Sequence, residues 1–410
     1  MKVLLVQPAF PISKKSRNHK NFLPIGLLKI GTYFQKKRRA EVKLIYGNKR
    51  VGFKPDEIWV TSLFTYWSEY FWDSVKFYRK AYPGSKIRVG GIYVSLSLKN
   101  HQLKQSFKEK CEKFNIKPHS GLYLPAEKYQ PDYSLVPTNP HPLDYQIIHA
   151  SRGCPRHCSF CYTWKLEPEF NSKKSISEEI CSNKLVFYDN NLLKNENIDE
   201  LLEEVANLKW GGKAVRCESQ SGFDGRILEE RPELAIALKK AKFDYPRIAW
   251  DWGFEQWVSI EKQINILKDA GYSSKNVYVF MIYNWKLSFE EMEKKRKKCW
   301  EWKIQITDCR YRPITQLHDY FDARKKVQTS EDYYIHEGWT DAEVKQFRRN
   351  VRKQNICVRH DFTFHSGKLE RKGVSKKESM KLRNMPPAKI RKILPDAWYP
   401  DNNMKLKGEK

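Results

Sequence analysis

The first 120 residues alternate short apolar runs with segments of helical spacing, and this alternation constrains the fold more than any other feature of the chain. The apolar runs that predict strands are Val3–Val6, Val42–Ile45, Ile58–Val60 and Ile87–Val89. Residues 67–80 have the spacing of a helix. Because strands that alternate with helices form parallel sheets covered on both faces, we expect an α/β, doubly wound domain over residues 1–120.

A second alternation follows over residues 144–320. Its predicted strands are 145–150, 185–188, 214–217, 248–250, 277–283 and 302–307, and the helical segments between them are 198–208, 230–239, 257–270 and 288–300. The helix over 198–208 is the clearest, since Ile198, Leu201, Leu202 and Val205 recur on one face. Six strand–helix units are too few to close an eight-stranded barrel. The sequence therefore predicts an open, partial (β/α)6 barrel of the TIM type.

Proline-rich sequence separates the two parts. Residues 121–143 contain Pro125, Pro131, Pro137, Pro140 and Pro142, which is typical of a linker. Residues 321–410 are mixed in character and rich in basic side chains, so we expect a small basic C-terminal extension that frays after Pro395.

Composition and charge exclude some classes of protein. Hydrophobic residues make up 40% of the 410 residues, which suffices for packed cores, and no apolar run approaches the roughly 18 residues of a membrane span. Nine cysteines in a chain of this length predict a reducing, cytoplasmic setting rather than a disulfide scaffold. The net charge is +28, of which residues 1–150 carry +16 and residues 331–410 carry +8. This distribution fits a polyanion such as nucleic acid, and the alternative is a solvated Lys-rich surface.

Three cysteines lie close together after the first strand of the second part. Cys154, Cys158 and Cys161 have the spacing C-x3-C-x2-C. Three thiolates leave one iron of a cubane iron–sulfur cluster open to an outside ligand, and the carboxyl ends of barrel strands are where such folds build active sites. The spacing therefore predicts a [4Fe–4S] cluster.

A zinc site or a chance cluster are the alternatives. Structural zinc sites take four ligands, typically from two cysteine pairs, and no second pair exists in this chain. His157 is poorly placed as a fourth ligand because it lies inside the cysteine loop. The other six cysteines are scattered singly, as buried small apolar residues usually are.

The motif CPRHCSFC, with Phe160 before its last cysteine, resembles the cluster motif of the radical S-adenosylmethionine superfamily. The resemblance covers about residues 145–320. It implies a cluster whose open iron chelates S-adenosylmethionine, which one electron cleaves to a 5′-deoxyadenosyl radical that abstracts a hydrogen atom. It also implies an electron donor such as flavodoxin or ferredoxin, and it agrees with the partial barrel expected from the strand count.

The first 120 residues resemble the cobalamin-binding-type, Rossmann-like domain that precedes the radical domain in one subgroup of that superfamily. Pro8, residues 24–28 (PIGLL) and residues 89–91 (VGG) carry this resemblance. The cobalamin motif D-x-H-x-x-G is absent. Cobalamin is therefore one interpretation of this domain, and a structural or substrate-binding role is the other.

The resemblance also suggests residues that contact the cofactor at the strand ends. Phe160 would pack beside the adenine ring or simply in the core. Asp189 would replace the usual glycine-glycine-glutamate turn at the methionine amine, or cap a helix. Polar residues after the third and fourth strands would hold the ribose and the sulfonium side of S-adenosylmethionine; these candidates are Glu218, Gln220 and Asp251. The alternative is that these residues form ordinary polar turns. Arg310 and Arg312 follow the sixth strand and would bind a carboxylate or phosphate, or form a surface ion pair.

Residues 339–360 predict a basic helix followed by an extended run, with Arg348, Arg349 and Arg352 available to a phosphate backbone. Nearby aromatic residues could stack on bases or fill a small core, namely Tyr333, Tyr334, Trp339, Phe362 and Phe364. The sequence thus favours a radical S-adenosylmethionine enzyme of unknown substrate, with methyl transfer or RNA modification open. The alternative is a nucleic-acid-binding protein with a structural or redox-sensing cluster.

Overall fold

A computed structural model of the chain describes residues 1–12, 22–137, 143–370 and 373–401. The N-terminal part is a five-stranded parallel sheet of order β2-β1-β3-β4-β5. Its strands are β1 (Lys2–Gln7), β2 (Glu41–Tyr46), β3 (Glu57–Ser62), β4 (Lys86–Gly91) and β5 (Ile116–Pro118). This confirms the Rossmann-like, doubly wound sheet predicted from the sequence, and it adds β5, which the apolar runs did not reveal.

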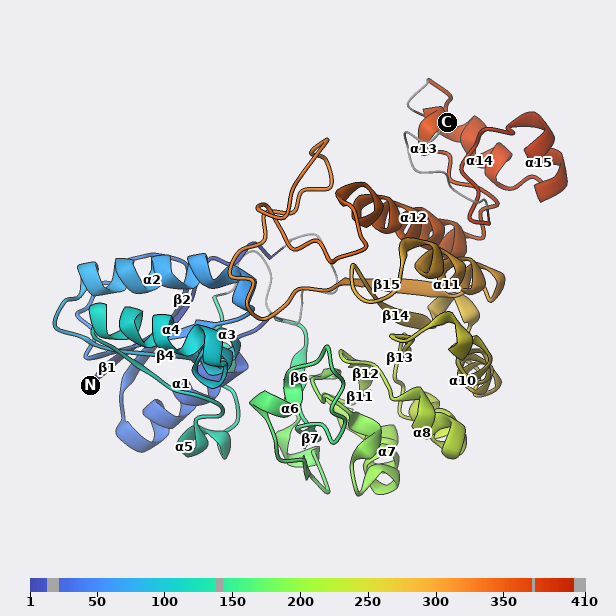
Figure 1. Ribbon diagram of the computed structural model, residues 1–410. Helices are drawn as coiled ribbons and strands as arrows, with labels where there is room; N and C mark the ends of the chain where they lie inside the picture. The colour runs from blue at the N-terminus through green and yellow to red at the C-terminus, as the bar shows by residue number, and fades with distance from the viewer. Residues whose placement is uncertain (13–21, 138–142, 371–372, 402–410) are drawn as a thin grey trace.

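Helices cover both faces of this sheet (Figure 1). Because side chains alternate along a strand, β1 feeds two cores: Leu4 and Val6 pack with α2 (Ser68–Ala81), α3 (Ile92–Lys99) and α4 (His101–Lys113), whereas Val3 and Leu5 pack with α1 (Ile25–Arg38). The helix predicted over 67–80 is confirmed by α2.

The proline-rich segment packs against α1. It contains α5 (Leu124–Glu127) and the 3-10 turn η3 (Tyr133–Leu135), and Ala126 is buried. Lys29 on α1 forms an ion pair with Glu127 at 2.7 Å. Part of the segment predicted as a linker, residues 138–142, lies outside the described residues.

The second part contains six parallel strands in chain order. They form two three-stranded sheets, ordered β12-β9-β6 and β13-β14-β15. Two isolated parallel bridges, Cys217 with Phe243 and Phe223 with Ile248, join the sheets between β12 and β13. The strands are β6 (Gln146–Ile148), β9 (Lys184–Phe187), β12 (Arg216–Ser219), β13 (Arg247–Ala249), β14 (Tyr278–Tyr283) and β15 (Gln305–Arg310). Curvature of these strands into a partial barrel stays a prediction.

Helices line one side of these strands and bury the largest core of the protein. On α7 (Ile198–Asn207) the predicted face is confirmed, since Ile198, Leu201, Leu202 and Val205 are buried. The remaining helices of this layer are α8 (Gly225–Glu230), α9 (Glu233–Lys240), α10 (Trp257–Asp269), α11 (Phe289–Glu301) and α12 (Asp341–His360).

Several predicted elements were wrong in extent. The strand expected over 214–217 is divided between residues 213–214 and β12, and the helix expected over 230–239 is divided between α8 and α9. The sixth strand begins at Gln305 rather than at residue 302, because α11 runs to Glu301 and Lys303 turns the chain with a φ of +57°. The segment predicted as a helix plus an extended run is one continuous helix, α12, which starts at a capping box between Thr340 and Glu343.

Three short helices complete the chain: α13 (Gly367–Glu370), α14 (Lys376–Arg383) and α15 (Pro387–Ile393). They surround a small core of Phe364, Ile390 and Tyr399. The chain is therefore packed beyond Pro395, where fraying was expected, and residues 402–410 lie outside the described residues. Among the described helices none has the length and apolar character needed to cross a membrane.

Candidate functional site

The cysteine loop leaves the carboxyl end of β6 through a two-residue strand, β7 (Ser151–Arg152), which pairs with β8 (Asn171–Ser172). Gly153 begins the loop with a φ of +77°, and a Cβ there would overlap the carbonyl oxygen of Glu169. A side chain at this position would push the loop out of place. The glycine therefore fixes the point from which the three cysteines start.

The three thiols are half-buried and close enough to influence one another. Burial raises the pKa of Cys154 and of Cys158, and the neighbouring thiol of Cys161 raises both further. The N–H of Cys161 donates to the Cys158 carbonyl at 3.0 Å, which closes the loop. Within the described ranges no three His, Cys, Asp or Glu side chains stand ready around a metal position. The donor set itself, three soft thiol ligands on one loop, suits an iron–sulfur cluster.

Asp189 is fully buried at the end of β9, and its carboxylate binds the strand that leads to the cysteine loop. It accepts hydrogen bonds from the Ala150 N–H at 3.2 Å, the Ser151 hydroxyl at 2.6 Å and the Ser151 N–H. Burial raises the pKa of Asp189 to about 6, although these donors oppose the shift. The structure thus places Asp189 behind the loop as a positioning residue, and it does not cap a helix.

Asp224 links the cysteine loop to α8, and no sequence pattern pointed to it. It pairs with Arg156 of the loop at 2.9 Å and with Arg226 at 2.8 Å. Burial opposes ionisation of Asp224, but the two guanidinium groups lower its pKa. Asn191 donates to the same carboxylate at 3.3 Å and also contacts the Cys154 thiol. Arg156 is therefore a docked residue rather than a solvated one.

Asp251, after β13, lies close to the loop. Burial raises the pKa of Asp251 to about 6, and Lys295 and Arg226 act against the rise. Its charge also raises the pKa of Cys158. Lys295, buried on α11, donates to the carbonyls of Trp250 and Trp252 at 2.7 Å each, so it holds the turn that carries Asp251.

The polar residues predicted after the third strand are engaged within the sheet. Glu218 accepts a hydrogen bond from Arg247 on β13, and Arg247 also donates to the Ser219 carbonyl at 2.5 Å. The backbone N–H of Gln220 donates to the Phe187 carbonyl at 2.9 Å. Glu218 faces the same side of the sheet as Val186, opposite the helices that pack on Leu185 and Cys217.

Arg310 is committed to Asp319. Its Nη2 donates to both carboxylate oxygens at 2.7 and 2.5 Å, and its guanidinium lies 4.5 Å from the Phe321 ring and 4.9 Å from the Tyr333 ring. Arg312 donates to the same carboxylate at 2.6 Å and stacks on Tyr66 of the N-terminal part at 4.4 Å. Both arginines are therefore paired with Asp319, and Arg312 also joins the two parts of the chain through its contact with Tyr66.

Phe160 meets a group of aromatic rings at the ends of β13 and β14. Its ring centroid lies 5.8 Å from that of Trp252 and 5.4 Å from that of Trp285. Trp252 is 40% exposed, whereas Trp285 is buried. Periodicity could not have revealed these tryptophans, but their positions two or three residues after strand ends could have.

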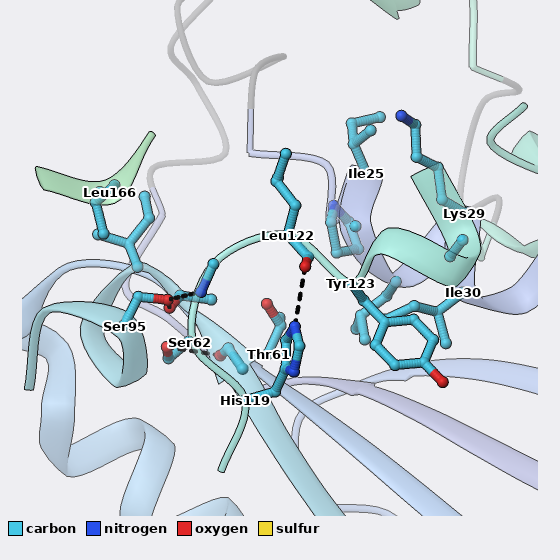
Figure 2. A pocket seen from close by; sticks show the side chains of 18 of the residues that line it. Ile25, Lys29, Ile30, Thr61, Ser62, Ser95, His119, Leu122, Tyr123 and Leu166 are labelled. Atoms are coloured by element: carbon cyan, nitrogen blue, oxygen red, sulfur yellow. Dashed lines mark hydrogen bonds between the residues drawn. The ribbon is translucent and has the colours of Figure 1, made fainter. Parts of the chain in front are cut away.

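A cavity of about 400 Å³ separates the N-terminal sheet from the cysteine loop. Figure 2 shows Ile25 and Lys29 of α1 on one side of it, with Ser95, His119 and Leu166 also at its wall. It lies at the carboxyl ends of β3, β4 and β5, beside the point where the strand order reverses, where α/β sheets bind ligands. This cavity was not predicted.

The cavity reaches the cysteine loop through two of its lining residues. Thr163 lies 3.4 Å from the Cys161 sulfur and 3.5 Å from the Asn190 Oδ1. The charges at the wall are internally paired, Lys29 with Glu127 and Arg152 with Glu167. The cavity therefore suits a small, uncharged group next to the loop.

The cavity does not suit an enclosed, histidine-ligated cobalamin. Pockets for drug-sized ligands span about 300–1,000 Å³, and a corrinoid is far larger than such a ligand. His119 uses its Nε2 on the Leu122 carbonyl at 3.0 Å, and His149 is half-buried, with its Nε2 2.9 Å from Arg152. Neither the space nor the two histidines at the cavity therefore fit this cofactor.

The aromatic residues proposed to stack on nucleic acid are mostly core residues. Tyr333, Trp339, Phe362 and Phe364 are buried, and only Tyr334 is half-exposed. The stacking hypothesis for the four buried rings is therefore wrong, because they fill the space around α12 and the C-terminal helices.

Comparison with models of protein families and with curated proteins gave no match for this chain.

Proposed function

We propose that this protein is a radical S-adenosylmethionine enzyme whose Cys154, Cys158 and Cys161 hold a [4Fe–4S] cluster. The observation that carries the proposal is the placement of three half-buried thiols on one loop at the carboxyl end of the first of six parallel strands. When bound, such a cluster supplies the electron that cleaves S-adenosylmethionine to methionine and a 5′-deoxyadenosyl radical.

The six strands run in chain order from β6 to β15, and the proposal takes them as a partial (β/α)6 barrel. In this arrangement the cysteine loop, Asp251 and the strand-end aromatic rings share the carboxyl rim, where barrel enzymes bind substrate. Phe160 packs beside the adenine of the cofactor, and Asp251 and Gln220 present polar groups to its ribose and methionine portions. Asp189, Asp224 and Lys295 hold the loop and the adjoining turn in place.

Glu218 and Arg310 have lesser roles in this proposal than the sequence suggested. The carboxylate of Glu218 is paired with Arg247, and the guanidinium of Arg310 with Asp319. The Glu218 pair would have to open before this carboxylate could bind a cofactor, and separating such a pair is costly. In the described part of the chain the Nε and Nη1 of Arg310 have no hydrogen-bond partner, but both are buried and the guanidinium lies against the rings of Phe321 and Tyr333. We assign them to holding neighbouring strands and segments together.

An acidic electron donor of the flavodoxin or ferredoxin kind fits the outer side of the loop. His157 and Lys165 are exposed there, and Arg156 is half-buried beside them. Positive charge at the docking surface speeds the approach of an acidic partner. All nine thiols are free of disulfides, which suits work in a reducing cytoplasm.

A second function is favoured by one observation, the net charge of +28. In it, the protein binds nucleic acid and the cluster is structural or redox-sensing. Cleavage of S-adenosylmethionine distinguishes the two functions, because only the radical enzyme would catalyse it.

Anaerobic reconstitution with iron and sulfide tests the proposal. The wild-type protein should bind about four irons and, when reduced with dithionite, form 5′-deoxyadenosine from S-adenosylmethionine. The variant with Cys154, Cys158 and Cys161 changed to Ala should do neither, whereas Cys181→Ala, which removes an exposed thiol elsewhere, should do both. Iron retained in full by the triple variant would refute the cluster assignment. A loaded cluster that binds S-adenosylmethionine without cleaving it would favour the second function.

A further inference from the structure

Three neighbouring strands each end in an aromatic residue near the cysteine loop. Trp252 follows β13, Trp285 follows β14 and Tyr311 follows β15 directly. We call these three residues, together with Phe160 and Tyr334, the aromatic band. Ring centroids in the band are 5.4–5.8 Å apart from one neighbour to the next.

Apart from Trp285, which is buried, the aromatic band differs from the ordinary core of this protein in exposure. Core rings such as Trp250 and Tyr283 are completely buried. Trp252 is 40% exposed, and Phe160, Tyr311 and Tyr334 are half-buried, although they lie in contact with other rings. Apolar ring faces left open to water at the carboxyl rim indicate a surface on which a flat group can stack.

Cations lie over and around this surface. The ammonium of Lys286 lies 5.2 Å from the Trp285 ring, and that of Lys165 lies 5.4 Å from the ring of Tyr162, whose hydroxyl is hydrogen-bonded to Tyr311. Both lysines are exposed. The acidic groups nearest the loop, Asp224 and Asp251, are half-buried; Asp224 pairs with Arg156 and Arg226, and Lys295 and Arg226 lie near Asp251. The exposed Glu337 lies near Tyr334. The surface therefore presents open rings flanked by two exposed lysines.

We infer that the aromatic band binds a single-stranded nucleic acid, one base of which stacks on Trp252 beside the cysteine loop. Every nucleobase has a flat π-face, and proteins bind single strands by combining stacking rings with cations that follow the phosphates. The exposed ammonium groups of Lys165 and Lys286 then meet the phosphates on either side of that base. An aromatic peptide would use the rings but would leave this charge unmatched.

This inference rests on the proposed function, because it names the substrate class of the same site. The base stacked on Trp252 is the one presented to the radical. Binding and cofactor cleavage are separate measurements, so either conclusion can fail without the other.

Fluorescence anisotropy of a labelled, unstructured RNA of about 12 nucleotides, within the span of about 4–16 nucleotides of single-strand sites, tests the inference on the cluster-loaded protein. Trp252→Ala should weaken binding about 5- to 150-fold, since stacking contributes about 1–3 kcal/mol per base. Trp252→Phe keeps a ring and should retain most of the affinity. Trp210→Ala is the matched control: Trp210 is 47% exposed on the hairpin that leads to the amino end of β12, and its loss should change binding less than twofold.

The same RNA sequence made as DNA distinguishes which nucleic acid is preferred. Equal affinities of the Trp252→Ala and Trp210→Ala variants would overturn the inference, and so would stronger competition by a Trp-containing acidic peptide than by unlabelled RNA. Loss of RNA binding with intact 5′-deoxyadenosine formation overturns the inference alone. Intact RNA binding without any 5′-deoxyadenosine overturns the proposed function alone.

Discussion

The carboxylate of Asp189 accepts hydrogen bonds from both the hydroxyl and the backbone N–H of Ser151, the former at 2.6 Å. Asp189 follows β9, and Ser151 begins the short strand that precedes the cysteine loop. The bonds thus tie the ends of neighbouring strands together directly behind the loop. Because this carboxylate is buried, its ionisation has a measurable cost.

We expect Asp189 to make the stability of the protein fall with rising pH over a defined window. The folded pKa of about 6 lies above the ordinary value of 3.8, so between these pH values the folded protein holds a proton that the unfolded chain has released. Stability from this group is fully present below about pH 4 and is lost as the pH rises through 6. Two pKa units correspond to roughly 3 kcal/mol.

Asp189→Asn removes the titrating group and is the comparison that isolates it. The difference in unfolding free energy between wild type and variant, measured by urea denaturation from pH 4.5 to 7.5, should change by a few kcal/mol and level off above pH 7. A difference that does not vary with pH would contradict the burial of an ionising carboxylate here.

Gly153→Ala should disrupt the start of the cysteine loop. Its φ of +77° strains an alanine, and the added Cβ would overlap the Glu169 carbonyl, so we expect roughly 2–4 kcal/mol of destabilisation and a lower iron content after reconstitution. Gly121→Ala is the matched control, because Gly121 has a φ of +75° with open space around it. It should cost about 1 kcal/mol, the strain of the backbone alone, and keep its iron. Equal iron contents in the two variants would show that the close approach at Gly153 is unimportant.

Arg296 should be one of the most sensitive residues for stability. It is fully buried on α11 and donates to Glu293, to Gln354 of α12 at 2.6 Å and to the Pro400 carbonyl at 2.6 Å. Arg296→Ala leaves a buried carboxylate unpaired and should cost about 3–5 kcal/mol. Arg231→Ala removes an arginine whose side chain is 40% exposed and has two acidic partners, and it should cost less than about 1 kcal/mol. Thermal unfolding of both variants measures the contrast.

The sequence located most strands because buried parallel strands are short apolar runs, such as Val3–Val6 in β1. It misplaced the sixth strand because the apolar residues before Gln305 belong to the end of α11 and a turn. The start of α12 is visible in the sequence as its Thr340–Glu343 capping box, a more specific signal than the basic residues that follow it.

At the candidate site, the position of each residue could be predicted from the sequence, but its partner could not. Asp189, Glu218 and Arg310 lie near strand ends as expected, although Glu218 is inside β12 and Arg310 is the last residue of β15 rather than a residue after its strand. Their partners lie 38, 29 and 9 residues away along the chain, so local spacing could not show that the carboxylates and the guanidinium are already bound. The cavity is similarly invisible, because its walls come from segments spread over residues 23–190.

The last prediction concerns which basic residues meet a nucleic acid. Arg348 and Arg349 of α12 are half-buried: Arg348 lies near the half-buried Asp308 and 5.5 Å from the Phe321 ring, and Arg349 donates to Gln346. Changing Arg348, Arg349 and Arg352 to Ala should therefore lower the melting temperature, because Asp308 loses the two cations that favour its charge, and should leave RNA affinity nearly unchanged.

The double variant Lys165→Ala and Lys286→Ala should lower the RNA affinity and leave the melting temperature nearly unchanged, since both lysines are exposed beside the aromatic band. Each phosphate that a lysine no longer neutralises should reduce the slope of log affinity against log salt by about 0.7 for a single strand. Anisotropy titrations at several salt concentrations measure these slopes. A reduced slope in the α12 variant and an unchanged slope in the lysine variant would place the strand on α12, away from the cysteine loop.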